Sequence, residues 1–318
     1  MATTGDRSST ASRRRPATAG FDVTGLLQRL GLWPLRVLWF LVPVVAGPAL
    51  SAALEGFERP GATVAEGFLW AGWFVGLVAC LVPAPMSLTG VRVLAPLLPV
   101  LAVAAGWGGS FDGAVAAAAG FGVVVTGVAF LPLVGDRMIN GSAYGSERRM
   151  ALRPPGFALV GPVQLAWLAV AVGLLTGPWL LATGRWLAGV VAVVVGAGLV
   201  WAGARVLHQL ARRWIVFVPA GFVLHDHTLL VESVLLQRST VRALGPASDP
   251  LPEEATDLTG WAWGLALEAV LSEPTRFGQR VRRDVHDLTS SRLVFTPTLP
   301  GAVLQEARVR AVAIGTVD

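Results

Sequence analysis

Six long apolar segments between residues 35 and 207 constrain the fold of this chain more than any other feature. Each is about 17–25 residues long, which is the length that an α-helix needs to cross a hydrocarbon core roughly 30 Å thick. With a mean hydropathy of +0.63 and only 14% charged residues, the chain is much more apolar than an ordinary soluble domain. We therefore predict an integral membrane protein with a six-helix transmembrane domain, whose spans are 35–54, 67–83, 88–107, 113–134, 156–181 and 186–207.

Two of the predicted spans leave alternatives open. In the third, Arg92, Pro96 and Pro99 interrupt the apolar pattern, so this segment could instead be re-entrant. In the first, residues 49–52 resemble the small-residue site at which signal peptides are cleaved. The arginine-rich region before this segment favours an uncleaved anchor, and cleavage would not change the topology of the later spans.

The chain before the first span divides into two parts. Residues 1–20 are rich in Ser, Thr, Ala and Arg and contain few apolar side chains, which predicts a disordered tail. Residues 21–34 place apolar side chains at helical spacing opposite polar ones, which is typical of an amphipathic helix that lies in the membrane interface. The apolar positions of this predicted helix are Val23, Leu26, Leu27, Leu30 and Trp33.

The sequence pattern changes at residues 206–226, where the last apolar span gives way to short alternating runs. Residues 214–218 are predicted to form a β-strand that ends at a Pro-Ala-Gly turn, and further short strands follow. Residues 245–257 are expected to form an exposed loop and residues 273–291 a polar, basic connection, before Pro300 opens an amphipathic helix. Residues 208–318 are therefore predicted to be a small β-rich domain closed by a C-terminal helix.

The distribution of arginines predicts the orientation in the membrane. Arginines of the tail, of the loop at 135–156 and of residues 205–213 fall on one side of the predicted spans, whereas the other side carries only Arg59 and Arg185. Since loops rich in Arg stay in the cytoplasm, we expect a cell-membrane protein with both termini cytoplasmic. The net charge of +5 comes from the tail and the membrane loops, and the C-terminal domain is near neutral, which argues against a nucleic-acid partner.

Two groups of arginines are candidates for binding anionic phospholipid or a partner protein. Each arginine near an anionic membrane surface can contribute on the order of 1 kcal/mol, and its planar guanidinium suits a phosphate group. The alternatives are a solvated connection balanced by Asp284 and Asp287 for the first group, and simple enforcement of the membrane orientation for the second. The first group is Arg276, Arg280, Arg282 and Arg283, and the second is Arg148, Arg149 and Arg153.

The predicted spans contain no Asp, Glu, Lys or His, which disfavours a proton-coupled or ion-coupled carrier. Gln164 is the most polar residue near the interior of a span and is the candidate for a polar path, or else for a hydrogen bond between helices. Small residues at four-residue spacing in the last span, at Ala188, Ala192 and Gly196, predict close packing between helices. This packing could occur within one chain or between copies in a homo-oligomer.

Few residues suggest chemistry. His225 and His227 would share a face of a strand and are weak candidates for a metal site, against the alternative of a solvated turn. The single cysteine, Cys80, lies in an apolar segment and offers neither a disulfide nor a cysteine metal cluster. The sequence contains no HExxH, P-loop, GxSxG or strand–GxGxxG–helix pattern, so we expect no catalytic residues and no cofactor.

The C-terminal third of the chain resembles the bacterial PH-like domains that are attached to membrane proteins. The similarity lies in the junction between helix and strand, in Arg238-Ser239-Thr240-Val241 before a further strand, and in the closing amphipathic helix. The whole chain is similar to uncharacterised multi-pass membrane proteins of high-GC Gram-positive (actinobacterial) type, through the stretches RRWIVFVPAGFVLHD and FTPTLPGAVLQEAR. This resemblance implies a curved sheet capped by a helix that binds lipid or protein, and it implies no reaction.

Two functions are compatible with these patterns. The first is a non-enzymatic membrane scaffold, in which the helical bundle holds a cytosolic PH-like module close to the lipid bilayer, where it binds anionic head groups or a membrane protein partner. The second is a small-molecule transporter or channel that the cytosolic domain regulates. The missing carboxylate or histidine constellation in and near the spans counts against an enzyme that acts on lipid.

Overall fold

The computed structural model describes residues 29–107, 111–281 and 284–316. Contacts divide the chain into two units, Met1–Leu30 and Gly31–Asp318, and the helices and strands described below belong to the second. The predicted tail at 1–20 and most of the predicted interfacial helix at 21–34 lie outside the described residues. Within that segment, Gly31 and Leu32 form a turn before the first long helix begins at Trp33.

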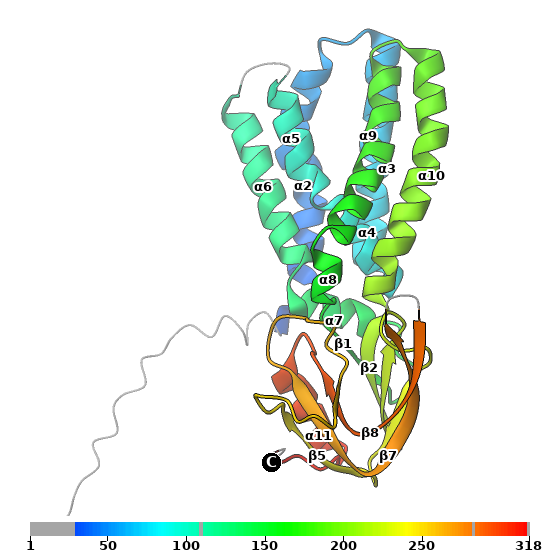
Figure 1. The fold of residues 1–318 in the computed structure, drawn as a ribbon. Coiled ribbons are helices and arrows are strands. Elements are labelled where there is room, and N and C mark those ends of the chain that lie inside the picture. Colours follow the sequence, from blue (N-terminus) through cyan, green and yellow to red (C-terminus); the bar gives the residue numbers. More distant parts are fainter. Residues whose placement is uncertain (1–28, 108–110, 282–283, 317–318) are drawn as a thin grey trace, which may run out of the picture. The chain divides into compact units, whose positions relative to one another are not determined.

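The first part of the described chain is helical (Figure 1). Five segments are long and apolar enough to cross a membrane, and a sixth candidate is a pair of helices bent by 57°. These five to six candidate spans confirm the predicted class of this region. The five are α2 (Trp33–Leu54), α3 (Arg59–Leu81), α4 (Pro85–Leu94) continued by α5 (Leu97–Trp107), α9 (Pro162–Ala182) and α10 (Trp186–Ala211), and the bent pair is α6 (Gly113–Ala129) with α7 (Pro132–Asn140).

Prolines account for most differences between predicted and observed helix boundaries. The third predicted span is interrupted at Pro96, which lacks the backbone donor that a continuous helix needs. The fourth stops at Ala129, and α7 then starts at Pro132 in a new direction. The fifth is divided into a single turn, α8 (Gly156–Leu159), and α9, whose first residue is Pro162.

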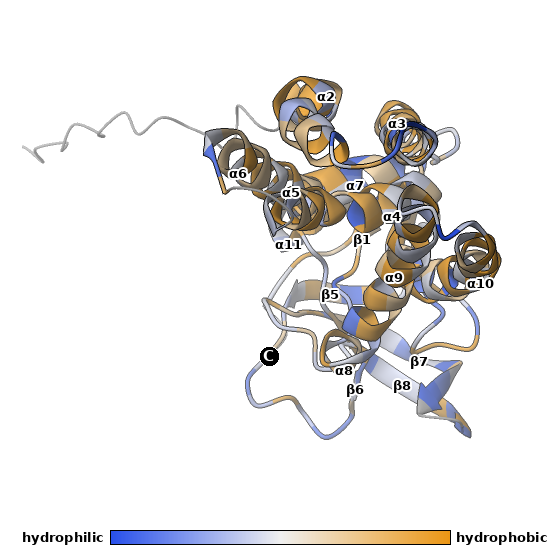
Figure 2. Cartoon of the chain, turned by 90° about the horizontal axis from the view of Figure 1, so that it is seen from above, coloured by the Kyte–Doolittle hydropathy of each residue, from blue (hydrophilic) through white to orange (hydrophobic). Residues whose placement is uncertain are grey.

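The helices pack as two groups that are joined by the contact between α2 and α3. One group is α2, α5 and α6, and the other is α3, α4, α9 and α10, and all of them are largely apolar (Figure 2). Within the second group, α9 and α10 cross closely at Gly173 and Gly196, where an added Cβ on either residue would meet the backbone of the other. The glycines of α10 that face α9 are Gly189, Gly196 and Gly203, so the small residues at this contact recur every seven positions and not every four.

Within the described residues, eight strands form two four-stranded sheets. The strands of the first sheet are all antiparallel to their neighbours, and those of the second are antiparallel except where β6 runs parallel to β8. The first sheet has the order β1 (Arg148–Ala151), β2 (Arg213–Val218), β3 (Gly221–Asp226) and β4 (Val234–Gln237). The second has the order β5 (Val241–Pro246), β7 (Leu267–Val281), β8 (Asp284–Phe295) and β6 (Ala255–Asp257), and α11 (Pro300–Val309) follows it.

The two sheets pack face to face around one apolar core. Phe217 and Phe222 of the first sheet and Phe277 and Phe295 of the second are buried in it. α11 closes the core with the buried side chain of Val303. The predicted β-rich region with a final helix is therefore confirmed.

One strand of the first sheet comes from the loop between two helices of the bundle. β1 follows α7 and precedes α8, and its residues pair with β2 from Arg148 opposite Phe217 to Ala151 opposite Trp214. The β-rich region is thus not confined to residues 208–318, where the sequence pattern placed it. A strand of four residues has too short a pattern to be recognised without its partner.

The basic stretch at 273–291, expected to be a connection, is instead part of a long hairpin. β7 and β8 pair along most of their length, with an irregularity between Val270 and Thr275. Among the described charges of this stretch, Arg276, Arg280 and Asp287 lie on the outer face, whereas Phe277 and Leu288 pack against the core. The loop expected at 245–257 also ends in the short strand β6.

The other face of the first sheet belongs to the core of the helical bundle. Trp214 and Ala151 on this face are buried together with Met138 and Ile139 of α7 and Ala211 of α10. This core extends into helices α2, α3, α4 and α6, so the bundle and the β-rich region form one folded unit. We call the end of the bundle that carries the sheets the sheet end, and the opposite end the far end.

Candidate binding surface and bundle cleft

A buried ion pair fixes the start of β2 at the sheet end. Arg213, the first residue of β2, donates to Asp226, the last residue of β3, over 2.5 Å, and the two side chains are 1% and 3% exposed. Arg213 also donates to the backbone carbonyl of Arg153, in the segment after β1. Asp226 accepts further hydrogen bonds from Thr228 and from the backbone N–H of Leu229. Because both charges have partners, the pair can persist away from water and joins three segments of the chain.

Arg148 and Arg149, two of the arginines that were predicted to bind lipid, contact partners within the chain at this junction between the bundle and the sheets. Arg148 forms an ion pair with the buried Asp136 of α7, with 2.8 Å between Nη2 and Oδ2. Arg149 pairs with Glu147 over 3.2 Å and lies over the ring of Trp214, 5.6 Å from its centroid. The first contact holds β1 against α7 and the last holds it against β2, so both guanidinium groups are engaged within the chain.

Arg153 lies apart from these two arginines. Its backbone N–H donates to the carbonyl of Thr296, just after β8, over 2.8 Å. Its side chain passes beside Gly264, where an added Cβ would lie 2.8 Å from Nε. The structure therefore does not bring the three arginines of this loop together, because two of them hold β1 and the third contacts the loop that precedes β7.

Arg276 and Arg280 are exposed on β7, toward the turn of the long hairpin. β2 starts directly after α10, β3 returns to this level at Asp226, and Leu229 then accepts a hydrogen bond of 2.8 Å from the backbone N–H of Arg280. This end of the hairpin therefore lies at the sheet end of the bundle, as Figure 1 also shows. Arg282 and Arg283, the other two members of the predicted cluster, lie outside the described residues.

The two described arginines share one face of the hairpin with an acidic residue. Arg276 and Arg280 flank Gly278 on that face, and Gly278 lies opposite Asp287 of β8. Cross-strand partners point to the same side of a sheet, so Asp287 lies between the two arginines. The surface therefore carries two exposed cations whose charge is balanced only in part.

His225 and His227 lie together beside the junction. Their rings contact each other edge to face, with 4.3 Å between the centroids. Nδ1 of His225 hydrogen-bonds with Ser233 over 2.7 Å, and Nε2 of His227 accepts a hydrogen bond of 3.2 Å from Arg212. Burial, with smaller contributions from the charges of His227 and Arg212, lowers the pKa of His225 to about 4.

Among the described residues, no third side chain that could bind a metal ion lies beside the two histidines. Asp226, which lies between them in sequence, points to the opposite face of β3 and is held by Arg213. Across residues 29–107, 111–281 and 284–316, no three His, Cys, Asp or Glu side chains lie close enough together to hold a metal ion. The contacts of both rings place them in the packing of the junction.

Gln164 lies in the first turn of α9 and not in the interior of a span. Its Oε1 accepts a hydrogen bond of 2.9 Å from the backbone N–H of Gly161, and its Nε2 donates to the carbonyl of Leu159 over 2.5 Å. The side chain is exposed and satisfies backbone groups at the start of its own helix. It therefore lies at the start of the span and links α9 to the adjacent α8, because the helix begins at Pro162 and not at Gly156.

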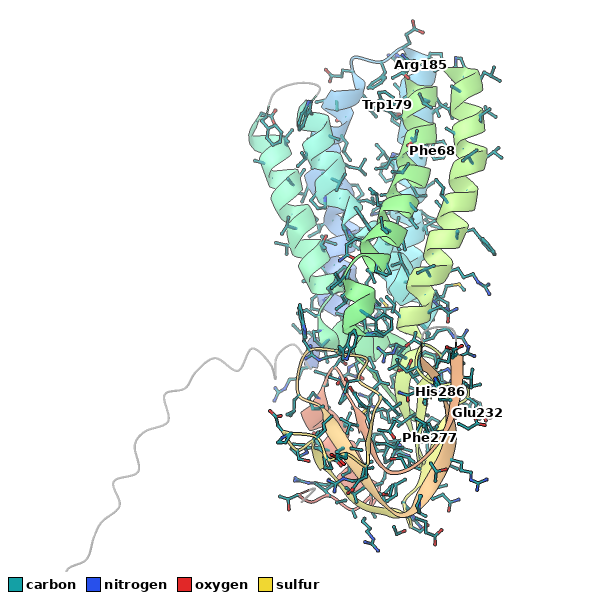
Figure 3. The ribbon with its side chains drawn as sticks, viewed as in Figure 1. Phe68, Trp179, Arg185, Glu232, Phe277 and His286 are labelled. Carbon is teal, nitrogen blue, oxygen red and sulfur yellow. The ribbon has the colours of Figure 1, made fainter. Side chains whose placement is uncertain are left out.

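A cleft of about 850 Å³ lies between the two helix groups, and no sequence pattern predicted it. α2, α3, α5 and α9 line it with apolar side chains, and Ser51 and Glu66 are its most polar residues. Phe68 and Trp179, which also line it, lie in the half of the bundle near the far end (Figure 3). The two groups of helices diverge toward the far end (Figure 1), and a local sequence pattern does not encode such a divergence.

Two tryptophans close the cleft toward the sheet end. Nε1 of Trp39 donates to the carbonyl of Trp73 over 2.9 Å, and Nε1 of Trp73 donates to the carbonyl of Trp39 over 3.1 Å. The ring of Trp39 lies directly against Gly76, where any Cβ would collide with it. This reciprocal pair joins α2 to α3 and bounds the cleft within the bundle.

The chain matches no family model, no curated protein and no solved structure. Its function is therefore inferred from the junction, the hairpin surface and the cleft.

Proposed function

We propose that this protein is a non-enzymatic membrane scaffold. Its helical bundle holds a cytosolic PH-like module against the inner leaflet of the cell membrane, where the module binds anionic phospholipid head groups. The observation that carries the proposal is the pairing of β1, which comes from the loop between two helices, with β2 of the sheet. Together with the shared core around Trp214, this pairing keeps the module at a fixed distance from the bilayer.

The proposed orientation rests on the charges at the two ends of the bundle. The loop between α7 and α8, at the sheet end, is rich in arginine, and arginine-rich loops favour the cytoplasmic side. A C-terminal tag that resists external protease in intact cells would support this orientation, and a tag that is cleaved would contradict it. The helix bounds place Glu55, Glu58, Arg59, Glu66, Asp112 and Arg185 at or near the far end, and Figure 3 shows Arg185 there.

The order of elements supports a PH-like identity. Two sheets and a closing helix follow one another, and α11 covers their common core with Val303 and Ala307, as the resemblance to bacterial PH-like domains implies. In such a module, the α9–α10 hairpin is an insertion between the first and second strands. The surface near that insertion is then the one that faces the membrane.

Arg276 and Arg280 are the residues that we propose to bind the head groups. Backbone hydrogen bonds of 2.9 Å at Gly278 and 2.8 Å at Arg280 fix their strand to residues 229–231, directly after the junction. The two guanidinium groups are thereby held near the lipid surface, and together they contribute about 2 kcal/mol to the binding of anionic lipid. Asp287 on the same face makes this figure an upper value.

Native mass spectrometry of the full-length protein, extracted from vesicles of phosphatidylglycerol and phosphatidylcholine, tests this assignment. Arg276→Ala/Arg280→Ala is expected to bind phosphatidylglycerol up to about thirtyfold more weakly, which corresponds to about 2 kcal/mol. The matched control, Arg238→Ala/Arg242→Ala, removes the same charge from exposed arginines at the other end of the sheets. The control should bind like the parent, and equal binding by all three proteins would contradict the proposal.

The cleft favours a second candidate function, the transport of a small apolar molecule under the control of the β-rich module. Gly72 lines the cleft and has open space around its Cβ position, so Gly72→Trp should fill the cleft without disturbing the packing of helices. Gly120 on α6 also has open space but does not line the cleft, which makes Gly120→Trp the control. The measurement is the uptake of small apolar compounds into proteoliposomes. If Gly72→Trp abolishes this uptake and Gly120→Trp does not, the result favours transport over the scaffold.

A further inference from the structure

An exposed aromatic turn lies between β6 and β7. Trp261 and Trp263 are 76% and 80% exposed, although both are large apolar side chains. Gly260 and Trp261 have φ values of 59° and 62°, a left-handed backbone that is uncommon for a bulky residue. A hydrogen bond of 3.2 Å from the backbone N–H of Ala262 to the carbonyl of Thr259 closes the turn. The turn thus holds both indole rings outside the β-rich core.

This turn is attached to α8, the helix that precedes α9. The backbone N–H of Gly156, at the start of α8, donates to the carbonyl of Gly260 over 2.9 Å. An added Cβ at Gly156 would lie 2.3 Å from the carbonyl oxygen of Trp261, and one at Gly260 would lie 3.4 Å from the ring of Phe157. The turn and α8 are therefore in direct contact, and only two residues separate α8 from the membrane-spanning α9.

The length of α9 sets the depth of the turn in the membrane. Its 21 residues extend over about 31 Å, which matches a hydrocarbon core of about 30 Å, so Pro162 lies near the sheet-side boundary of the hydrocarbon. The head-group layer extends roughly 5–7 Å beyond that boundary. Since α8 is a single turn about 6 Å long, the attached aromatic turn lies within this layer or directly beside it.

Apolar side chains continue from the turn to the start of α9. Phe157 and Val160 are exposed in and after α8, and Leu265 is exposed after the two tryptophans. A contiguous apolar patch of this kind is unfavourable in water, whereas indole rings are favoured at the boundary between hydrocarbon and water. Arg153, whose guanidinium passes beside Gly264, adds a cation close to the same patch.

We propose that Trp261 and Trp263 insert into the interfacial layer of the leaflet on the sheet side and anchor the β-rich region there. The occupant of the apolar patch is the lipid of the membrane that the chain itself crosses. This anchor uses no residue of the β7–β8 hairpin, so it does not depend on the proposed binding of head groups by Arg276 and Arg280.

Single-cysteine labelling of the full-length protein tests the anchor. Cys80 is the only cysteine of the chain and is buried, so the parent protein should take up no label and serves as the blank. A nitrobenzoxadiazole label at Trp261→Cys or Trp263→Cys is measured in nanodiscs of phosphatidylcholine with nitroxide-labelled lipid. We expect strong quenching by a nitroxide near the head group and weaker quenching by one at the end of the acyl chain.

Ser239→Cys provides the control site, away from the bilayer. β2 leads away from α10 over about 17 Å to Val218, and the backbone N–H of Arg238 donates to Ala220 just beyond, so the neighbouring Ser239 lies at the opposite end of the sheets. Leu265→Cys is a second reporter that leaves both indoles in place. Quenching at positions 261, 263 and 265 several times stronger than at 239 supports the anchor. Equal quenching at all positions overturns the anchor, and the two indole rings would then face water or a protein partner.

Discussion

The pair formed by Arg213 and Asp226 is the link between bundle and sheets at the scale of single residues. If Asp226 is removed, the guanidinium of Arg213 loses its anionic partner while it stays buried, and we expect Asp226→Ala to lower the free energy of unfolding by about 3–5 kcal/mol. Glu306→Ala breaks a more exposed pair with Arg310 in α11 and should cost less than about 1 kcal/mol. Chemical denaturation of both variants in micelles measures the difference, and equal losses would contradict the role given to the buried pair.

His225 is expected to make stability depend on pH. In the folded protein its pKa is about 4, below the ordinary value of 6.5, because burial and the charges of His227 and Arg212 disfavour its protonated form. Between these pH values the unfolded chain binds more protons than the folded one, so the contribution of His225 is fully present above about pH 6.5 and is lost as the pH falls toward 4. The free energy of unfolding, measured across this pH range, should depend less on pH in His225→Gln than in the parent protein. His286 is exposed on β8, so His286→Gln is the control. If both variants show the same pH dependence of stability as the parent protein, His225 is not the cause of that dependence.

At the scale of elements, the α9–α10 hairpin depends on the close approach of two glycines. An added Cβ at Gly196 would lie 2.3 Å from the carbonyl oxygen of Gly173, whereas Gly198 on the same helix has open space around its Cβ position. Gly196→Val should therefore cost about 1–3 kcal/mol through overpacking. Gly198→Val should be nearly neutral, and thermal unfolding of the two variants side by side tests this difference. Equal destabilisation would mean that the two helices do not cross at Gly196.

The helices could be predicted from the sequence because their signal is long and local. α10 begins at the predicted Trp186, and a run of about twenty apolar residues identifies a span whatever its neighbours are. β1 and the part of the β7–β8 hairpin within residues 273–291 were not predicted as strands. The four residues of β1 show no clear period, and the outward charges of the hairpin conceal an inner face that only its partner strand reveals. Helices and strands could thus be predicted wherever the residues of a single segment were enough to identify them.

The candidate site was predictable only in part, for the same reason. The sequence identified Arg276 and Arg280 as candidates, but it could not show that Arg148 has a partner in Asp136, because that pairing depends on where α7 and β1 begin. The aromatic turn can be recognised in the sequence, since Trp261 and Trp263 lie between Gly260 and Gly264, with acidic residues on either side of this segment. Two tryptophans in such a loop need either a core or a membrane to cover them.

At the scale of the whole molecule, the bundle and the sheets form one unit because the chain passes between them repeatedly. It leaves the bundle after α7 to form β1, returns through α8 to α9 and α10, and enters the sheets again at Arg213. A fragment that starts at residue 212 would lack Met150 and Leu152 of the core and would expose the edge of β2. The β-rich region is therefore part of the same folded unit as the helical bundle and not a tethered domain.

Hydrogen–deuterium exchange of the full-length protein in nanodiscs tests this fixed attachment most directly. The backbone N–H of Leu152 donates to the carbonyl of Arg213 over 3.0 Å, at the point where the loop between two helices joins the sheet. If β1 is a strand of that sheet, the amide of Leu152 should exchange as slowly as the amides of β2. An amide at Leu152 that exchanges as fast as an open loop, while β2 stays protected, would contradict the account.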